Sequence, residues 1–289
     1  MKKKFLLSLL LLIPVLFVLT ACQQSKSADK SKSKQEIVTT FEPMYEFTKA
    51  VAGDKVKVTN IVPGNQEVHE FEPSAKEVAT LTDAAAIVYN SDNLEKWVLS
   101  IKGKGVKIEA SKTVTPIGED PHTWVSPKEA VIEVQYISEQ LAKIFPDYKA
   151  DFEKNAAAYV KQLKEIDKDF EQLKNAVNKT FITQHEAFSY LARDYGLNQI
   201  NIAGLDPEAE PSSATLAKLK LEMEKSGLTT VYFEDNSNSA IAETLAKETG
   251  AELLVINPVE GLTSAQKKAG ENYLSIMKEN LASLKKTIH

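Results

Sequence analysis

The amino-acid sequence predicts an α/β protein of two pseudo-repeated (β/α) lobes that are joined by one long rigid helix. From residue 36 onward, short β-rich runs alternate with stretches of helical period, a pattern typical of parallel-sheet folds. The same order of elements occurs twice, and a long helical stretch separates the two copies. The chain of 289 residues is 43% hydrophobic and 26% charged, which suffices for two lobes with packed cores.

The first copy contains five predicted elements. In order, they are a strand at 37–41, a helix at 44–52 ended by Gly53, a strand at 56–62, a helix opened by a Ser74–Glu77 capping box, and a strand at 85–89.

The second copy repeats this order. Its elements are a strand at 180–183, a helix at 187–195 ended by Gly196, a strand at 199–203, a helix capped by Ser212 or Ser213 that runs to about Lys225, and a strand at 229–233. Two short sequence matches support a true repeat. EPSA at 72–75 corresponds to EPSS at 210–213, and VYNSDN at 88–93 corresponds to VYFEDN at 231–236.

A helical connector lies between the copies. Ser126 and Glu129 form a predicted capping box with Pro127 at the first helical position, and this helix runs to Phe145 before Pro146 breaks it. The next helical stretch, 147–177, would span about 45 Å. We therefore expect an N-terminal lobe at 36–146, a linking helix at 147–177 and a C-terminal lobe at 178–289, with a ligand-binding cleft between the lobes.

The N-terminal segment is predicted to direct and anchor the protein rather than to fold. Residues 1–21 have a lysine-rich start and an apolar run too short to span a bilayer, as in a signal peptide. They end in LTAC, which resembles the lipobox of bacterial lipoproteins, so Cys22 is the expected lipidation site. Residues 22–35, with the Ser/Lys-rich run QQSKSADKSKSKQ, then form a flexible tether. The mature protein is expected on the extracellular or periplasmic face of the cell membrane.

Composition excludes several classes of function. The formal net charge is −5 and the only arginine is Arg193, so a nucleic-acid-binding surface is not expected. Cys22 is the only cysteine, which excludes an internal disulfide framework and any cysteine-rich metal site.

Three of the four histidines stand at junctions between predicted strands and loops: His69, His122 and His185. The fourth, His289, lies at the last position of the sequence. Loops at strand ends can converge on one point, and imidazole is the commonest neutral metal ligand. The sequence therefore predicts a metal site in the cleft between the lobes. Three imidazoles suit Zn²⁺, and nickel or copper are chemically reasonable competitors.

A closed tetrahedral site needs a fourth ligand. Glu234 and Asp235 follow the last predicted strand of the second copy, and either carboxylate could serve. If a carboxylate closes the site, no position remains for an activated water, and a metal hydrolase is disfavoured. The sequence also lacks the HExxH and GxSxG motifs of hydrolases, so the protein is not expected to be an enzyme.

Five ordered motifs give the chain a specific resemblance: the lipobox, HEFEPS around His69, DPHTW around His122, TQHEAFSYLA around His185 and YFEDN around Glu234. Together they resemble the solute-binding lipoproteins of bacterial ABC importers for zinc and manganese. The resemblance runs from Ile37 to the end of the chain. It implies two (β/α) lobes joined by a long helix, one buried metal ion, and the ligand set His69, His122, His185 and Glu234. It also implies a membrane permease as partner, and we expect a monomer.

The third ligand position separates the branches of this family. Manganese members resemble this chain but have a carboxylate where His185 stands, so the resemblance implies the zinc branch and one Zn²⁺ per chain. One departure is the absence of a long loop rich in histidine and acidic residues before DPHTW; only residues 116–119 occupy that region. A manganese-binding transport lipoprotein and a surface adhesin are the alternative functions.

Overall fold

The computed structural model describes residues 36–64, 66–209, 211–234 and 240–289, all within one compact unit. The predicted signal peptide, Cys22 and the tether lie outside these residues, as does Asp235. Within the described part of the chain, no helix combines the length and the apolar character needed to cross a bilayer.

The first lobe is built on a four-stranded parallel sheet of strand order β2-β1-β3-β4. Its elements are β1 (Glu36–Thr39), α1 (Glu42–Ala52), β2 (Lys57–Asn60), α2 (Ala75–Asp83), β3 (Ala86–Tyr89) and β4 (Val106–Glu109), with 3₁₀ turns at Lys96–Ser100, Ala110–Thr113 and Thr123–Val125. The central strands β1 and β3 are almost wholly buried, as their continuous apolar runs predict.

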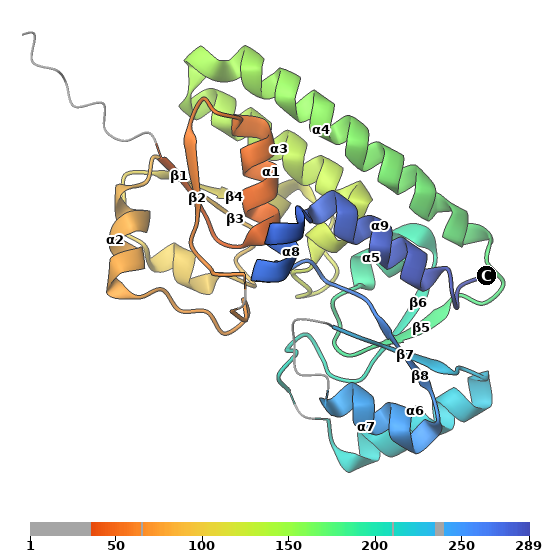
Figure 1. The fold of residues 1–289 in the computed structure, drawn as a ribbon. Helices are drawn as coiled ribbons and strands as arrows, with labels where there is room; N and C mark the ends of the chain where they lie inside the picture. Colours follow the sequence, from red (N-terminus) through yellow and green to blue (C-terminus); the bar gives the residue numbers. More distant parts are fainter. Residues whose placement is uncertain (1–35, 65, 210, 235–239) are drawn as a thin grey trace, which may run out of the picture. The chain divides into compact units, whose positions relative to one another are not determined.

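The second lobe repeats this topology, with strand order β6-β5-β7-β8 (Figure 1). Its elements are β5 (Thr180–Thr183), α5 (Ser189–Tyr195), β6 (Asn198–Asn201), α6 (Ser213–Ser226), β7 (Thr230–Phe233), α7 (Ala240–Thr249) and β8 (Glu252–Val255). The first, second, third and fourth strands of one lobe occupy the same places in their sheet as the corresponding strands of the other lobe. The predicted pseudo-repeat of α/β lobes is therefore confirmed.

Two helices come after the last strand of the first sheet and before the first strand of the second. They are α3 (Pro127–Ile144) and α4 (Lys149–Phe170), which pack on each other, with a 3₁₀ turn at Pro146–Tyr148 between them and another at Glu171–Asn175. Pro146 ends the first helix, as the sequence predicts. The second helix is shorter than the predicted 147–177; at 22 residues it spans about 33 Å.

The last two helices return to the first lobe. They are α8 (Ser264–Ala269) and α9 (Tyr273–Leu284). Lys267 forms an ion pair with Glu42 of α1, and the backbone N–H of Tyr273 donates to Glu46 of the same helix. The lobe boundaries expected from the sequence stay a prediction. A boundary at 178 assigns each sheet to one lobe, but α8 and α9, which come after it in the sequence, contact α1 of the first lobe.

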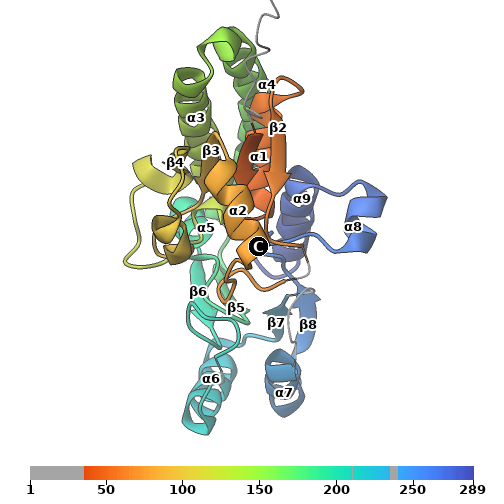
Figure 2. The ribbon, with the colours of Figure 1, turned by 90° about the vertical axis from the view of Figure 1, so that its left-hand side faces the viewer.

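The second sheet is covered on both faces. Successive side chains of a strand point to opposite faces. Phe181 and Tyr232 therefore join the large core that includes α4, α5 and α9, whereas Ile182 and Val231 pack with α6 and α7 in a separate core. Figure 2 shows α6 and α7 together on the side of this sheet away from α9.

All three predicted helix starts are confirmed, but the predicted side-chain capping is present at only two of them. Ser74 and Glu77 form the full capping box of α2, and Ser212 accepts the N–H of Thr215 at the start of α6. Ser126 makes no side-chain cap for α3; its hydroxyl donates to Asp194 at 2.5 Å. The predicted partner Glu129 instead binds Arg193, also of α5, so contacts between the lobes replace the local capping box.

Candidate metal centre

Four side chains converge in the described part of the chain: His69, His122, His185 and Glu260. They come from loops that follow the strands β2, β4, β5 and β8 in the sequence, so each lobe supplies two. The carboxyl ends of parallel strands are where such sheets bind ligands. The structure thus brings together the three histidines that the sequence singles out, at a point between the lobes.

His69 is the most accessible of the four, with 13% of its side chain exposed. It lies in the loop before α2, where Glu67 accepts its backbone N–H at 3.0 Å. Its Nε2 atom faces Glu260 at 3.3 Å.

His122 is completely buried, and Asp120 holds it in place. Oδ1 of Asp120 accepts both the backbone N–H of His122, at 2.9 Å, and its ring Nδ1–H, at 2.8 Å. A proton on Nδ1 leaves the lone pair of Nε2 free to bind a metal.

His185 is also completely buried, and it follows β5 directly. Its Nδ1 atom donates to Oε1 of Glu234 at 2.6 Å. Glu234 follows β7, the neighbour of β5 in the sheet, so the pairing of the two strands places these side chains together. As at His122, a carboxylate on Nδ1 turns Nε2 towards the centre.

Glu260 lies in a tightly held loop after β8. The N–H of Val259 donates to Oδ1 of Asn257 at 2.6 Å, and Asn280 of α9 bonds both backbone groups of Asn257. Val259 has a φ of 62°, a left-handed conformation that is costly for a β-branched residue. The adjacent Gly261 approaches the backbone of Gly64, in the His69 loop, so closely that a Cβ atom would lie 2.4 Å from the Gly64 carbonyl oxygen.

Five of the six separations between the four ligand atoms are close to those of a tetrahedral site, and all six are within 4.8 Å. Nε2 of His122 lies 3.2 Å from Nε2 of His69 and 3.4 Å from Nε2 of His185. Oε1 of Glu260 lies 3.3, 3.4 and 3.7 Å from the Nε2 atoms of His69, His122 and His185. Ligands bound to Zn²⁺ at about 2.0–2.1 Å in a tetrahedron stand about 3.3 Å apart. The donor types and their separations therefore both fit a tetrahedral zinc site.

The charges in the site favour a cation at its centre. Burial by itself would lower the pKa of His185, but the carboxylates of Glu234 and Glu260 outweigh it and hold that pKa well above its usual value. Burial would raise the pKa of Glu260, but hydrogen bonds from the three imidazoles outweigh it and hold that pKa well below its usual value. Either protons or a dication can supply this positive charge, so the two compete for the same place.

The fourth position differs from the sequence expectation. The structure does not bring Glu234 to the point where the imidazoles meet, because its carboxylate lies on the Nδ1 side of His185, and Glu260 occupies the expected place. The sequence reasoning missed Glu260 because it missed β8, a short edge strand that is half exposed. The apolar run at 253–255, followed by a carboxylate, was the available signal.

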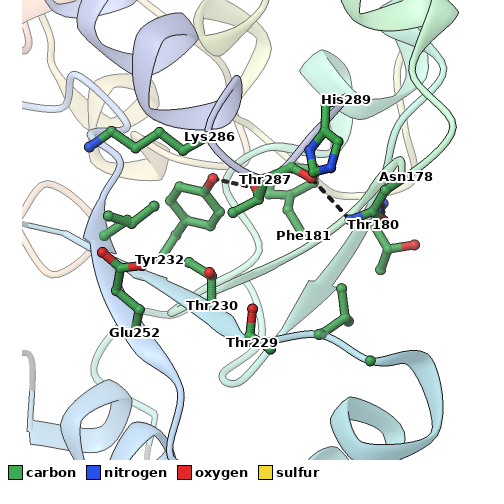
Figure 3. A pocket seen from close by; sticks show the side chains of 13 residues that line it. Asn178, Thr180, Phe181, Thr229, Thr230, Tyr232, Glu252, Lys286, Thr287 and His289 are labelled. Atoms are coloured by element: carbon green, nitrogen blue, oxygen red, sulfur yellow. Dashed lines mark hydrogen bonds between the residues drawn. The ribbon is translucent and has the colours of Figure 1, made fainter.

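A separate pocket of about 360 Å³ lies at the other end of the second sheet (Figure 3). Its lining includes the first residues of β5, β7 and β8, which are Thr180, Thr230 and Glu252. Tyr232 donates to the carbonyl of Ser283 there and shares a hydrogen bond with Thr287, which ties the end of α9 to the sheet. This pocket is at the amino ends of the strands, whereas the converging histidines are at the carboxyl ends.

Comparison with protein families gives one match over almost the whole described chain. The family described as "ZnuA: Zinc-uptake complex component A periplasmic" matches residues 37–287. The "Zinc-binding lipoprotein AdcA" of Streptococcus pneumoniae strain R6 is 45% identical over 306 residues, which cover 97% of this chain and 60% of that protein. The chain thus spans about three fifths of the length of such relatives. The "High-affinity zinc uptake system protein ZnuA" of Bacillus subtilis is 41% identical, with 94% of this chain and 97% of that protein covered.

Solved structures agree with the sequence relatives. The Zn(II)-bound ZnuA-like domain of S. pneumoniae AdcA superposes with a TM-score of 0.80 and 47% identity, covering 88% of this chain and 99% of that domain. The laminin-binding protein Lmb of Streptococcus agalactiae, described as a bifunctional protein with adhesin and metal transporting activity, superposes with a TM-score of 0.82 and 37% identity, covering 88% and 100%.

Proposed function

Because the chain belongs to the ZnuA family of zinc-uptake components, we propose that it captures Zn²⁺ outside the cytoplasm and delivers it to the permease of an ABC importer. The family is a component of an uptake complex and not a family of enzymes. The observation that carries the proposal is the convergence of three imidazoles and one carboxylate at separations close to those of a tetrahedral zinc site. Zinc is also the metal in the names of the relatives.

We propose His69, His122, His185 and Glu260 as the zinc ligands. Three borderline-soft imidazoles and one carboxylate are typical of zinc, whereas Mn²⁺ favours more oxygen ligands. Four protein ligands close a tetrahedral shell, so no position remains for the activated water of a zinc hydrolase.

Glu234 then has an indirect role. By accepting Nδ1–H of His185 it fixes the tautomer that presents a lone pair at Nε2, and Asp120 does the same for His122. Carboxylates in this position commonly raise the basicity and fix the orientation of a histidine ligand.

We propose a location for the protein from a motif in its N-terminal segment. The LTAC motif supports lipidation at Cys22, which would hold a monomer on the outer face of the membrane through the tether at 22–35. A Cys22→Ser variant should then leave the membrane fraction, while its zinc binding in solution stays unchanged.

The experiment that tests the function is metal selection by the purified protein. After equilibration with equal amounts of Zn²⁺ and Mn²⁺ and removal of free ions, we expect one zinc per chain and almost no manganese. His122→Ala should lose the zinc, whereas His289→Ala, a control histidine outside the site, should retain it. Manganese in the wild-type protein, or zinc retained by His122→Ala, would contradict the proposal.

A further inference from the structure

A buried hydrogen-bonded network holds the loop that carries His122. The hydroxyl of Thr123 contacts Oδ1 of Asn90 at 2.9 Å and hydrogen-bonds to Oε1 of Glu133. Asn90 also donates from Nδ2 to the carbonyl of Pro121 at 2.6 Å. The residues on both sides of His122 are therefore held by one network, which joins the end of β3 to the interior of α3.

The protons in this network can be assigned from its donors and acceptors. The Pro121 carbonyl only accepts, so Nδ2 of Asn90 must face it and Oδ1 must face Thr123. Oδ1 of Asn90 has no proton, so the Thr123 hydroxyl donates to it. A hydroxyl has a single proton to donate. The proton in the hydrogen bond between Thr123 and Glu133 must then come from Glu133, whose side chain is a carboxylic acid.

The surroundings of Glu133 agree with a neutral side chain. The residue is completely buried, and within the described chain its second oxygen, Oε2, has no hydrogen-bond partner. An ionised carboxylate in this position would lose most of its solvation. Burial raises the pKa of Glu133 to about 8 and outweighs the lowering that a hydrogen bond donated by Thr123 to the ionised carboxylate would cause; the charges of Glu129 and Glu95 raise the pKa further. Tyr273 of α9 is also buried, and burial, with neighbouring groups that include Glu133, raises the pKa of its phenol well above the usual value.

We propose that Glu133 is held as a neutral carboxylic acid and positions the His122 loop for zinc binding by donating a hydrogen bond to Thr123. The inference rests on the proposed function for its link to zinc, while the protonation of Glu133 stands independently of it. Glu133 is a positioning residue, because it acts on the ligand through Thr123 and Asn90.

Two variants of nearly equal size separate donation from packing. Glu133→Gln retains a neutral donor, so its zinc affinity at pH 7 should stay within about twofold of the wild type. Glu133→Met fills a similar volume without a donor, and its affinity should fall by about tenfold, as for other groups that orient a metal ligand indirectly. If Glu133→Met does not fold, Thr123→Val breaks the same bridge and should give the same loss. Equal affinity in wild type, Gln and Met variants would overturn the positioning role.

The pH dependence of stability tests the protonation state without zinc. Between the pKa of an unfolded glutamate, about 4.3, and the folded value, the folded state keeps a proton that the unfolded state has lost. Rising pH therefore favours unfolding of the wild type by up to about tenfold in equilibrium constant per pH unit, and Glu133→Gln lacks this contribution. In metal-free protein, the stability of Glu133→Gln relative to the wild type should rise steadily from pH 5 to pH 8. A constant difference over that range would show that Glu133 is ionised.

Infrared difference spectra give a direct readout. At pH 7 the wild type should show the carbonyl stretch of a protonated carboxylic acid that is absent from Glu133→Gln. Lack of this band would overturn the assignment, whether or not the protein binds zinc. Failure of the proposed function gives a different result, because the wild type itself would then not bind zinc.

Discussion

Oε1 of Glu234 lies 2.6 Å from Nδ1 of His185, whereas the other ring nitrogen, Nε2, faces Nε2 of His122 at 3.4 Å. The pair consists of a buried imidazole and a buried carboxylate that both follow central strands of the second sheet. Glu234 and Glu260 thus contact the same ring from its two nitrogens, and only Glu260 stands at the convergence point.

The two glutamates should differ in their effect on zinc binding. Glu234→Gln should lower the affinity by about 10–100-fold and keep one zinc per chain, because it weakens only the orientation of His185. Glu260→Gln should cause a larger loss, since it removes an anionic ligand. Isothermal titration with a competing chelator measures both, and Glu248→Gln, on the exposed side of α7, is the matched control. A larger loss in Glu234→Gln than in Glu260→Gln would reverse the assignment.

Zinc affinity should fall steeply on mild acidification. The carboxylates overcome burial and raise the pKa of His185, and Glu260 likewise raises that of His69, so protons compete with zinc above the usual imidazole value of about 6.5. In the metal-free protein, the raised histidine pKa values have the opposite effect: the stability of the fold decreases as the pH rises. A histidine with a raised folded-state pKa contributes stability that is present below its unfolded pKa and lost as the pH rises through the folded one. Melting curves from pH 5.5 to 9 should show metal-free protein losing stability with rising pH, while the stabilisation by zinc increases. A zinc effect that is constant over this range would argue against histidine ligands.

The contact between Gly261 and Gly64 should be necessary for the position of Glu260. Gly261→Ala puts a methyl group against the Gly64 carbonyl oxygen and must displace one of the two ligand loops. We expect zinc affinity to fall at least tenfold, by analogy with other positioning contacts. Gly204→Ala is a suitable control, because a Cβ there meets no atom within 4 Å. Equal affinities in the two alanine variants would show that the close approach has no role in binding.

Replacing His185 should change the preference between metals. His185→Glu exchanges a borderline-soft ligand for a hard one and adds a carboxylate beside Glu260, which favours Mn²⁺ over Zn²⁺. Competition titration should show a lower zinc-to-manganese affinity ratio than in the wild type. An unchanged ratio would mean that position 185 does not set the selectivity.

Local sequence patterns predicted the parts of the fold that depend on local chemistry. The buried strands at 37–41 and 180–183, the Ser74 cap and the two copies of one topology all follow from apolar runs and capping residues that act within a few positions. The edge strands β4 and β8 were missed, although β2 and β6, edge strands of the same length and similar exposure, were predicted.

The site was predictable as far as it depends on strand ends. His69, His122 and His185 could be found because each follows or precedes a recognisable element. The choice between Glu234 and Glu260 depends on tertiary structure: the turn of Val259 and the contact of Gly261 with Gly64, in the other lobe, bring Glu260 into the site. Neither has a local sequence pattern. The same is true of Ser126, whose hydroxyl binds Asp194 in the other lobe rather than its own helix.

A crystal structure of the zinc-loaded protein, with the metal located by anomalous scattering at the zinc edge, tests the central proposal most directly. We expect one zinc ion bound by Nε2 of His69, His122 and His185 at about 2.0–2.1 Å and by a carboxylate oxygen of Glu260 at about 2.0–2.2 Å. Glu234 should remain hydrogen-bonded to Nδ1 of His185. A metal ion bound through Glu234, or one that leaves any of the three histidines uncoordinated, would contradict this ligand set.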